Sequence, residues 1–227
     1  REGATDKALM FRANDKSKDQ SYFLFATTQE QLDFLRFPLG SLTKNETRDF
    51  AKKLGLNVHD KKDSQDICFI PNGDYKSFIK LNAKEGNVID KSGKVLGKHD
   101  GIHNFTIGQR RGMGIASEKP LYVVDIIKDT NEIIVGDKEH LLGQSLILDE
   151  LNFIMPDIDI SAPTLKIKCS AKIRSLSTPS EGTLYKKENT YSFIFDNPTE
   201  SITRGQACVL YDNERVLGGG IIKQKLN

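Results

Sequence analysis

The feature that most constrains the fold is the absence of a helical period from residue 146 onward. Short apolar runs alternate there with turn-forming residues at close spacing. Residues 183–195 and 207–217 each have the pattern of a hairpin. Several such strands in succession indicate an antiparallel β-barrel or a β-sandwich.

One strand in this region has a strict alternation of two residue classes. Its apolar positions are Leu165, Ile167, Cys169, Ala171 and Ile173, and its polar positions are Lys166, Lys168, Ser170, Lys172 and Arg174. Alternate residues of a strand point to opposite faces of the sheet. Cys169 is therefore expected to be structural. Two interpretations of the cationic face stay open, a track for an RNA backbone or an ordinary solvated face.

The first half of the sequence mixes helix and strand signals. Thr43 and Glu46 have the spacing of a capping box, which predicts a helix that begins after Thr43. Gly55 is placed to end this helix. A second helical segment is expected over 29–37 and a third over 74–81. Hairpins are expected over 87–96 and 121–135. The glycine-rich stretch 99–117 between them carries Arg110 and Arg111, which could bind phosphate.

Composition excludes several classes of protein. The 227 residues have a net charge of +2 and three cysteines that form no close pair. A disulfide scaffold and a CxxC zinc site are therefore excluded, and any RNA-binding charge must be local. No apolar run approaches the roughly 20 residues that cross a bilayer, so no membrane association is expected. His99 and His103 lack a third ligand, so we expect hydrogen-bonding histidines and no metal.

Cys68 lies at the junction of a polar run and a short apolar run. Two lysines and small polar residues precede it, and Pro71 ends the apolar run that contains it. Nearby cations favour a thiolate, whereas Asp63 and Asp66 oppose it. The residues alone leave two roles open for Cys68, a reactive thiol or a small buried hydrophobic side chain.

Five stretches of the chain together resemble the tRNA-specific 2-thiouridylases. The first is Lys61-Lys62-Asp63-Ser64 followed by Ile67-Cys68-Phe69-Ile70, which is similar to the family's second-cysteine motif. The others, in family order, are Ser17-Lys18-Asp19-Gln20-Ser21-Tyr22-Phe23-Leu24, Gly108-Gln109-Arg110-Arg111-Gly112 followed by Gly114-Ile115, Tyr122-Val123-Val124-Asp125 and Leu217-Gly218-Gly219-Gly220-Ile221-Ile222.

The resemblance implies a reaction and its partners. ATP, bound with Mg by an N-terminal domain, would adenylate the 2-oxygen of a wobble uridine. A persulfide on Cys68, loaded by a cysteine desulfurase or a relay protein, would supply the replacing sulfur. A first cysteine would then release it, through a disulfide with Cys68 or as free sulfide. The expected location is cytoplasmic.

The resemblance also implies tRNA contacts in this chain. The residues concerned are Lys18, Asp19, Gln20, Arg174, Ser175 and Gln206, and Arg110 and Arg111 are further candidates. The family often has an aromatic residue at position 175, where this chain has serine.

The implied architecture is α+β and mostly β. Residues 1–37 would end a truncated N-terminal α/β domain, residues 38–143 would form a small mixed central domain with Cys68 and the 99–117 loop, and residues 144–227 would form an antiparallel barrel like that of elongation factors. The family's Ser-Gly-Gly-x-Asp-Ser loop is not in the sequence. We therefore expect the C-terminal part of a longer enzyme, inactive alone.

Two alternatives belong to other functional classes. A non-catalytic tRNA-binding module would use the barrel and leave Cys68 inert. A thiol redox protein would turn over peroxide or disulfide without tRNA, but the chain has no resolving cysteine near Cys68.

Overall fold

The computed structural model describes residues 7–61, 84–155 and 157–226. Within it the chain divides into two compact units, one formed by 1–60 together with 143–227 and the other by 61–142. Each unit has its own hydrophobic core. The helix expected over 74–81 and the Cys68 motif lie outside the described residues. The domain boundaries expected at 37 and 143 concern the intact protein and stay predictions.

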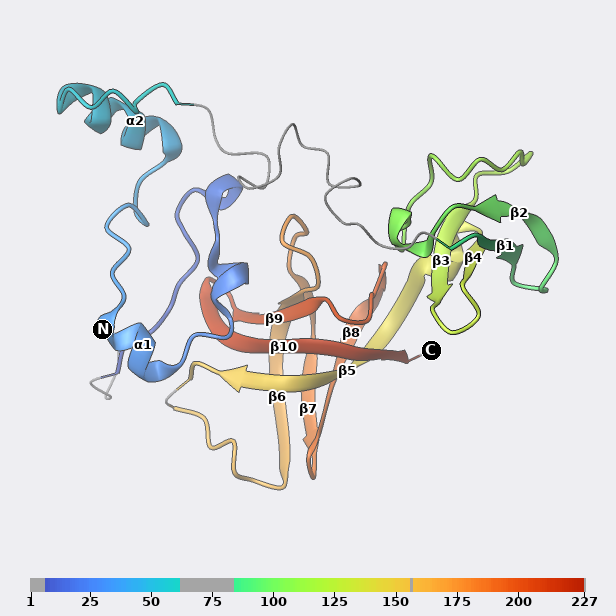
Figure 1. Ribbon diagram of the computed structural model, residues 1–227. Helices are drawn as coiled ribbons and strands as arrows, with labels where there is room; N and C mark the ends of the chain where they lie inside the picture. Colours follow the sequence, from blue (N-terminus) through green and yellow to red (C-terminus); the bar gives the residue numbers. More distant parts are fainter. Residues whose placement is uncertain (1–6, 62–83, 156, 227) are drawn as a thin grey trace. The chain divides into compact units, whose positions relative to one another are not determined.

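The second unit contains a four-stranded mixed sheet (Figure 1). The two expected hairpins are confirmed: β1 (Gly86–Asp90) pairs with β2 (Val95–His99), and β3 (Tyr122–Ile127) pairs with β4 (Glu132–Gly136), both antiparallel. The parallel pairing of β1 with β4 joins them in the order β2-β1-β4-β3. Two short 3-10 helices, η4 (Ile102–Asn104) and η5 (Lys138–Leu141), complete the described part of this unit.

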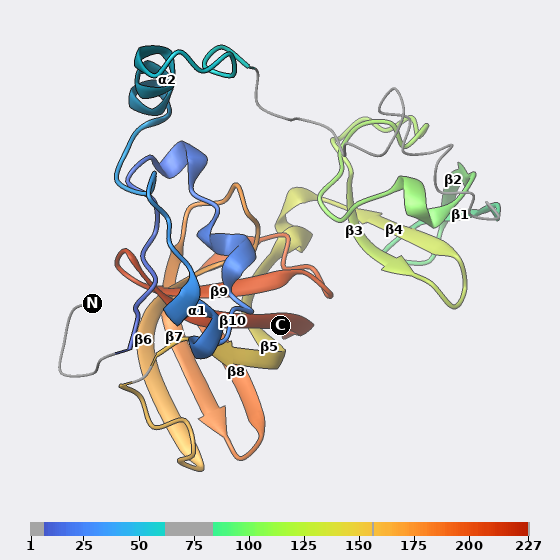
Figure 2. The same cartoon turned by 60° about the vertical axis from the view of Figure 1, so that its left-hand side comes forward.

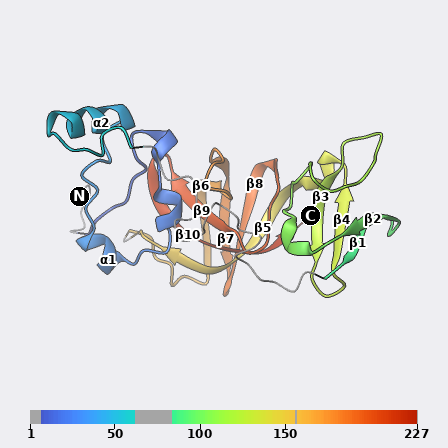
Figure 3. The same ribbon diagram turned by 45° about the horizontal axis from the view of Figure 1, so that its top comes forward.

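The strands after residue 141 close into a barrel, which settles the choice between barrel and sandwich. They are β5 (Leu142–Phe153), β6 (Thr164–Lys172), β7 (Ser180–Lys187), β8 (Thr190–Glu200), β9 (Ala207–Asp212) and β10 (Arg215–Leu226). Their order around the barrel is β10-β5-β8-β7-β6-β9. Figure 3 shows these strands, coloured from yellow to red, in another view. The predicted hairpins β7–β8 and β9–β10 are confirmed.

The apolar face of β6 fills the barrel, as its alternation predicted. Cys169, Ala171 and Ile173 are buried there with Phe193 and Phe195. The glycine run 218–220 forms a bulge in β10, where the register with β9 shifts after Val216. Gly218 has φ +135°, and a side chain there would meet the Asn152 carbonyl oxygen at 2.1 Å. This is the bulge or barrel-corner role expected of that run.

A second layer covers part of the outer wall of the barrel. It consists of the N-terminal segment with η1 (Lys16–Lys18), η2 (Ser21–Leu24) and α1 (Gln29–Phe34), drawn in blue beside β9 and β10 in Figure 2. Met10, Tyr22 and Leu32 pack there against Val209 and Tyr211 of β9. Strand β9 is therefore buried on both faces.

Helix α2 (Lys44–Lys53) forms where its end signals predicted. The Thr43 side chain accepts from the Glu46 amide, and the Glu46 side chain accepts in return from the Thr43 amide. At the other end Gly55 has φ +67°, and the Leu56 amide donates to the Ala51 carbonyl. These are the two terminal motifs that satisfy unpaired backbone groups. The fold as a whole is mostly β, as expected.

Candidate nucleic-acid interface

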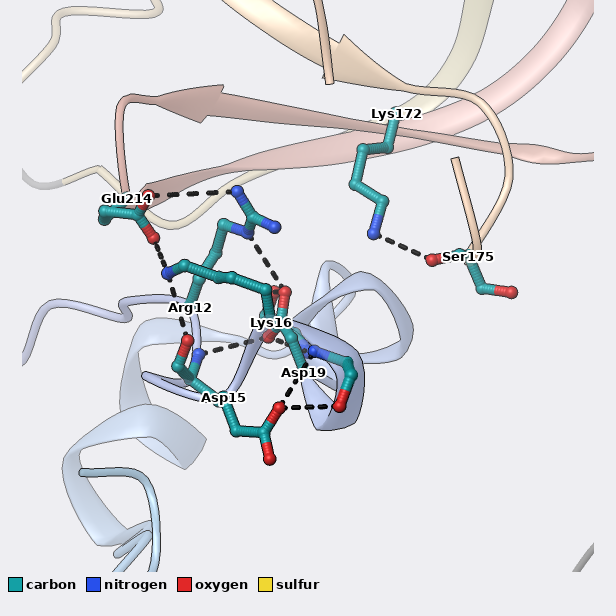
Figure 4. Close-up of polar contacts among 10 residues, drawn as sticks. Arg12, Asp15, Lys16, Asp19, Lys172, Ser175 and Glu214 are labelled. Atoms are coloured by element: carbon teal, nitrogen blue, oxygen red, sulfur yellow. Dashed lines mark hydrogen bonds and ion pairs between the residues drawn. The ribbon is translucent and has the colours of Figure 1, made fainter. Parts of the chain in front are cut away.

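The Asp19 carboxylate is the centre of a buried polar cluster in the N-terminal segment (Figure 4). One oxygen accepts from the amides of Ala13 and Ser21 at 3.2 and 3.1 Å. The other accepts from Arg12 Nε and Ser21 Oγ, both at 3.1 Å. Only 1% of the side chain is exposed. Asp19 therefore shapes the turn between η1 and η2, with its carboxylate directed into the protein.

The Arg12 side chain ties this turn to the β9–β10 hairpin. Its guanidinium carbon lies 5.6 Å from the centre of the Tyr211 ring, a cation–π contact. Its Nη1 atom lies 3.9 Å from a carboxylate oxygen of Glu214, which binds Lys16 as well. Burial raises the pKa of Asp19, but the hydrogen bonds from Ser21, Ala13 and Arg12 outweigh it, so the pKa lies below its ordinary value. The carboxylate is therefore ionised at neutral pH.

Tyr22 connects η2 to the start of β9. Its hydroxyl donates to the Ala207 carbonyl at 2.9 Å, and its side chain is buried. Lys172 Nζ lies over the face of its ring, 5.8 Å from the centroid. Gln206 directly precedes Ala207 and is exposed. The tyrosine ring thus lies between the turn that carries Asp19 and the loop that carries Gln206.

Lys172 corrects the expectation for the polar face of β6. The four cations were expected to share one face open to solvent, but Lys172 is only 4% exposed. Its Nζ donates to the Ser175 carbonyl at 2.7 Å. Further along the same strand, Lys168 is paired with Asp196 at 2.5 Å. The four cations of this strand therefore do not form one exposed face, because the N-terminal segment covers Lys172.

Arg174 and Ser175 lie directly after β6. An Arg174 Nη atom is 3.4 Å from the Thr203 hydroxyl, which places this residue beside the loop of Gln206. That loop turns at Gly205, where φ is +83°, and the Gln206 amide donates to the Thr203 carbonyl at 3.2 Å. Three of the segments predicted to contact tRNA, around residues 18–20, 174–175 and 206, are therefore joined by direct contacts. Their role in binding stays a prediction.

Arg110 and Arg111 belong to the other unit and are exposed. The Gln109 side chain accepts from the Thr106 amide and donates to the Arg111 carbonyl, which holds their turn. The amide of Gly108 and that of Val123 tie it to the sheet. These bonds give both arginines a defined support, and their proposed contact with RNA stays a prediction.

The two cysteines in the described part of the chain are structural. Cys169 and Cys208 are free and buried in the barrel. Burial raises the pKa of Cys169 to about 12, and burial also raises that of Cys208. Cys68 and the disulfide that the resemblance gives it lie outside the described residues.

The His99 side chain is buried, and both of its ring nitrogens contact backbone groups of the protein. Nδ1 accepts from the Gly101 amide at 3.0 Å, and Nε2 lies 3.1 Å from the Asn131 carbonyl. The described ranges contain no group of three His, Cys, Asp or Glu residues that could hold a metal ion. No helix within them is long and apolar enough to span a membrane.

The internal members of this site are not predicted by the sequence patterns. Those patterns give no internal contact to Arg12, Tyr22 or Tyr211, and they place Lys172 on an exposed face, either solvated or in contact with RNA. One signal was available, because Asp19 and Ser21 have the spacing of an Asx turn, in which the aspartate side chain is used by the backbone. No local pattern indicates that Arg12 reaches Tyr211.

Comparisons with known proteins cover nearly the whole chain. Residues 1–72 match a family model described as the tRNA methyl transferase HUP domain, residues 76–137 match the tRNA methyl transferase PRC-barrel domain, and residues 143–222 match the aminomethyltransferase beta-barrel domain. The third match coincides with the closed barrel. Together they define the class of proteins in which these three domains follow one another.

Curated relatives narrow the class. A tRNA-specific 2-thiouridylase MnmA of Hyphomonas neptunium is 46% identical over 224 residues, which are 96% of this chain and 57% of the relative. The MnmA of Nostoc punctiforme is 43% identical over 97% of the chain and 63% of its own length. The MnmA of Caulobacter vibrioides is 48% identical over 93% of the chain and 57% of its own length. The chain belongs to the MnmA family, and it spans about 60% of the length of these relatives.

Proposed function

We propose that the chain supplies the tRNA-binding surface and the sulfur-carrying cysteine of a tRNA-uridine 2-sulfurtransferase. The relatives are named for 2-thiouridylation of tRNA. The observation that carries the proposal is that Tyr22 and Lys172 link three segments far apart in sequence, those that hold Lys18 and Gln20, Arg174 and Ser175, and Gln206. Side chains that mix cations with amides suit contacts to phosphate and sugar.

Within this surface the proposed roles differ. Lys18, Gln20, Arg174, Ser175 and Gln206 would contact the RNA. Asp19 would act indirectly, because its carboxylate is buried and accepts four hydrogen bonds from Arg12, Ala13 and Ser21. By ordering the turn, Asp19 would hold its neighbours Lys18 and Gln20 in place. Arg110 and Arg111 would add phosphate contacts from the other unit.

The chemistry would be sulfur transfer from Cys68. When bound by the intact protein, ATP supplies the adenylyl group that turns the 2-oxygen of the wobble uridine into a leaving group. The terminal sulfur of a persulfide on Cys68, delivered by a donor protein, is a strong nucleophile that mainly needs positioning against C2. Its attack would displace AMP, and the first cysteine of the intact protein would then break the S–S bond by forming a disulfide with Cys68, which leaves the sulfur on C2. The target base must leave the anticodon stack to reach it. We assign no ATP contact to any residue of this chain.

Replacing Cys68 tests the catalytic half of the proposal. In the intact protein Cys68→Ser should abolish 2-thiolation of tRNA and leave tRNA affinity within about two-fold, since serine cannot carry a persulfide. Thiolation would be followed by mass spectrometry of tRNA nucleosides and binding by fluorescence anisotropy. Cys169→Ala, which removes a buried thiol, should keep thiolation. Unchanged thiolation in the Cys68 variant would instead favour a binding module with an inert cysteine.

Replacing Arg174 tests the binding half. Arg174→Ala should weaken tRNA binding and lower the slope of log K against log salt by about 0.7 to 0.9, the effect of losing one phosphate contact. Lys168→Ala is the matched control, because its ammonium is already paired with Asp196. That control should keep the wild-type slope. An affinity that does not depend on salt in the wild type would contradict the proposed surface.

A further inference from the structure

Lys172 is the only buried lysine among the residues that the structure describes. Removing an ammonium from water is unfavourable unless other groups replace the lost hydration. Burial accordingly lowers the pKa of Lys172, and the charge of Asp19 opposes that effect. The ammonium of Lys172 makes contacts with a carbonyl and an aromatic ring that an apolar side chain could not make.

The ammonium of Lys172 contacts two separate segments. It donates to the Ser175 carbonyl at 2.7 Å, and it lies over the Tyr22 ring at 5.8 Å from the centroid. Figure 4 shows the side chain reaching from β6 toward the Ser175 carbonyl. Tyr22 in turn donates to the Ala207 carbonyl, next to Gln206. One side chain thereby links the turn after β6, helix η2 and the loop before β9.

The segment that Lys172 holds is a closed turn. The Ser177 amide and hydroxyl both bond to the Arg174 carbonyl, at 3.2 and 2.8 Å. Leu176 lies in this turn, between Arg174 and Ser177, and is 98% exposed. Single exposed leucines are common and carry no argument alone. Here the leucine stands on a turn fixed from both sides, directly beside Arg174 and Ser175.

We propose that Lys172 is a positioning residue for the RNA interface. It fixes the turn 174–177 against η2, so that Arg174 and Leu176 meet the RNA backbone and an adjacent ribose or base face in one defined geometry. Lys172 itself does not touch RNA. This inference rests on the proposed function, and it adds a residue that acts from beneath the contact surface.

A double-mutant cycle in the intact protein tests the proposal. Lys172→Met should weaken tRNA binding about ten-fold in the wild-type background, but only about three-fold in an Arg174→Ala background, because the residue acts through the turn that holds Arg174 and only the contact of Leu176 is then left to lose. The salt slope of the double variant should equal that of Arg174→Ala alone. Lys172→Arg, which keeps a donor and a cation, should restore most of the affinity.

Three results would overturn the proposal. They are wild-type affinity in Lys172→Met, equal losses in the two backgrounds, and a further fall of the salt slope in the double variant, which would mark a direct phosphate contact. Ser177→Ala loosens the same turn without touching the buried ammonium. It should weaken binding in the same Arg174-dependent way, and it decides the question if Lys172→Met does not fold. Absence of tRNA binding by the wild type would instead refute the proposed function.

Discussion

Asp15 and Asp19 show how differently two aspartates of one segment are used. Asp15 accepts from the Ser17 hydroxyl and amide and from the Lys44 amide at the start of α2, and it remains at the surface. Asp19 is almost completely buried and faces Arg12. A hydrogen-bonded carboxylate that loses its charge inside a protein leaves its cationic partner unpaired, which is far more destabilising than the same loss in water.

The first stability prediction concerns this buried pair. Asp19→Asn should lower the free energy of unfolding by about 2–3 kcal/mol, since an amide cannot balance Arg12 and has one acceptor oxygen for four donors. Asp15→Asn is the control and should have a clearly smaller effect. Urea unfolding followed by circular dichroism would measure both. Equal losses in the two variants would contradict the internal role of Asp19.

The same pair predicts a pH dependence. The pKa of Asp19 is lower in the folded protein than its unfolded value of about 3.9. The unfolded state therefore binds the proton first as the pH falls, and the contribution of Asp19, complete above that value, is lost as the pH falls through the folded pKa. The stability difference between wild type and Asp19→Asn should thus be constant from pH 7 to about 5 and shrink below about 4. A difference that grows on acidification would show the opposite sign.

At the level of elements, Gly182 is a position in the barrel where a side chain would not fit. Gly182 of β7 pairs with Phe195, and a Cβ there would lie 2.4 Å from the Ile194 carbonyl oxygen and 2.5 Å from a ring carbon of Phe193. The carbonyl belongs to the neighbouring strand and cannot move without breaking the ladder. Gly182 therefore allows β7 and β8 to approach closely over the large aromatic side chains.

This close approach gives the second stability prediction. Gly182→Ala should destabilise the barrel by about 1–3 kcal/mol, the usual effect of overpacking a filled interior. Glu181→Ala, at the exposed neighbouring position of the same strand, should change stability by less than about 0.5 kcal/mol. Thermal and urea unfolding of both variants would measure the difference. An alanine tolerated at position 182 would mean that the strands can separate without loss.

Elements also show which predictions local sequence supports. The end signals of α2 and the hairpin patterns of β7–β8 and β9–β10 concern residues close in sequence, and the structure confirms them. The alternation in β6 correctly predicted its barrel face. It failed for Lys172, because alternation predicts the side of the sheet on which a residue lies and carries no information about what covers that side.

At the level of the molecule, the barrel of one unit contains two of the three cysteines. Cys169 and Cys208 are enclosed in the barrel with raised pKa values. Reaction with a disulfide reagent requires an accessible thiolate. Cys169 and Cys208 should therefore not react while the protein is folded.

Thiol labelling tests that expectation. At pH 8 the folded Cys68→Ser chain should show no fast reaction with a chromogenic disulfide, and two thiols should react after unfolding in urea. The difference from wild type then measures Cys68 directly. Fast labelling of the folded variant would contradict the enclosure of the barrel cysteines.

The sequence by itself determined the features that depend on neighbours along the chain, namely the helix caps, the hairpins, the strand alternation and the motifs that indicated the family. Only the tertiary structure decided the strand order of the closed barrel, the cover over β9 and the burial of Lys172. It also decided that Tyr22 and Lys172 link the segments near residues 20, 175 and 206. The physical reason is that these contacts join residues up to 185 positions apart. Whether a polar side chain is solvated or buried depends on which distant segment packs against it.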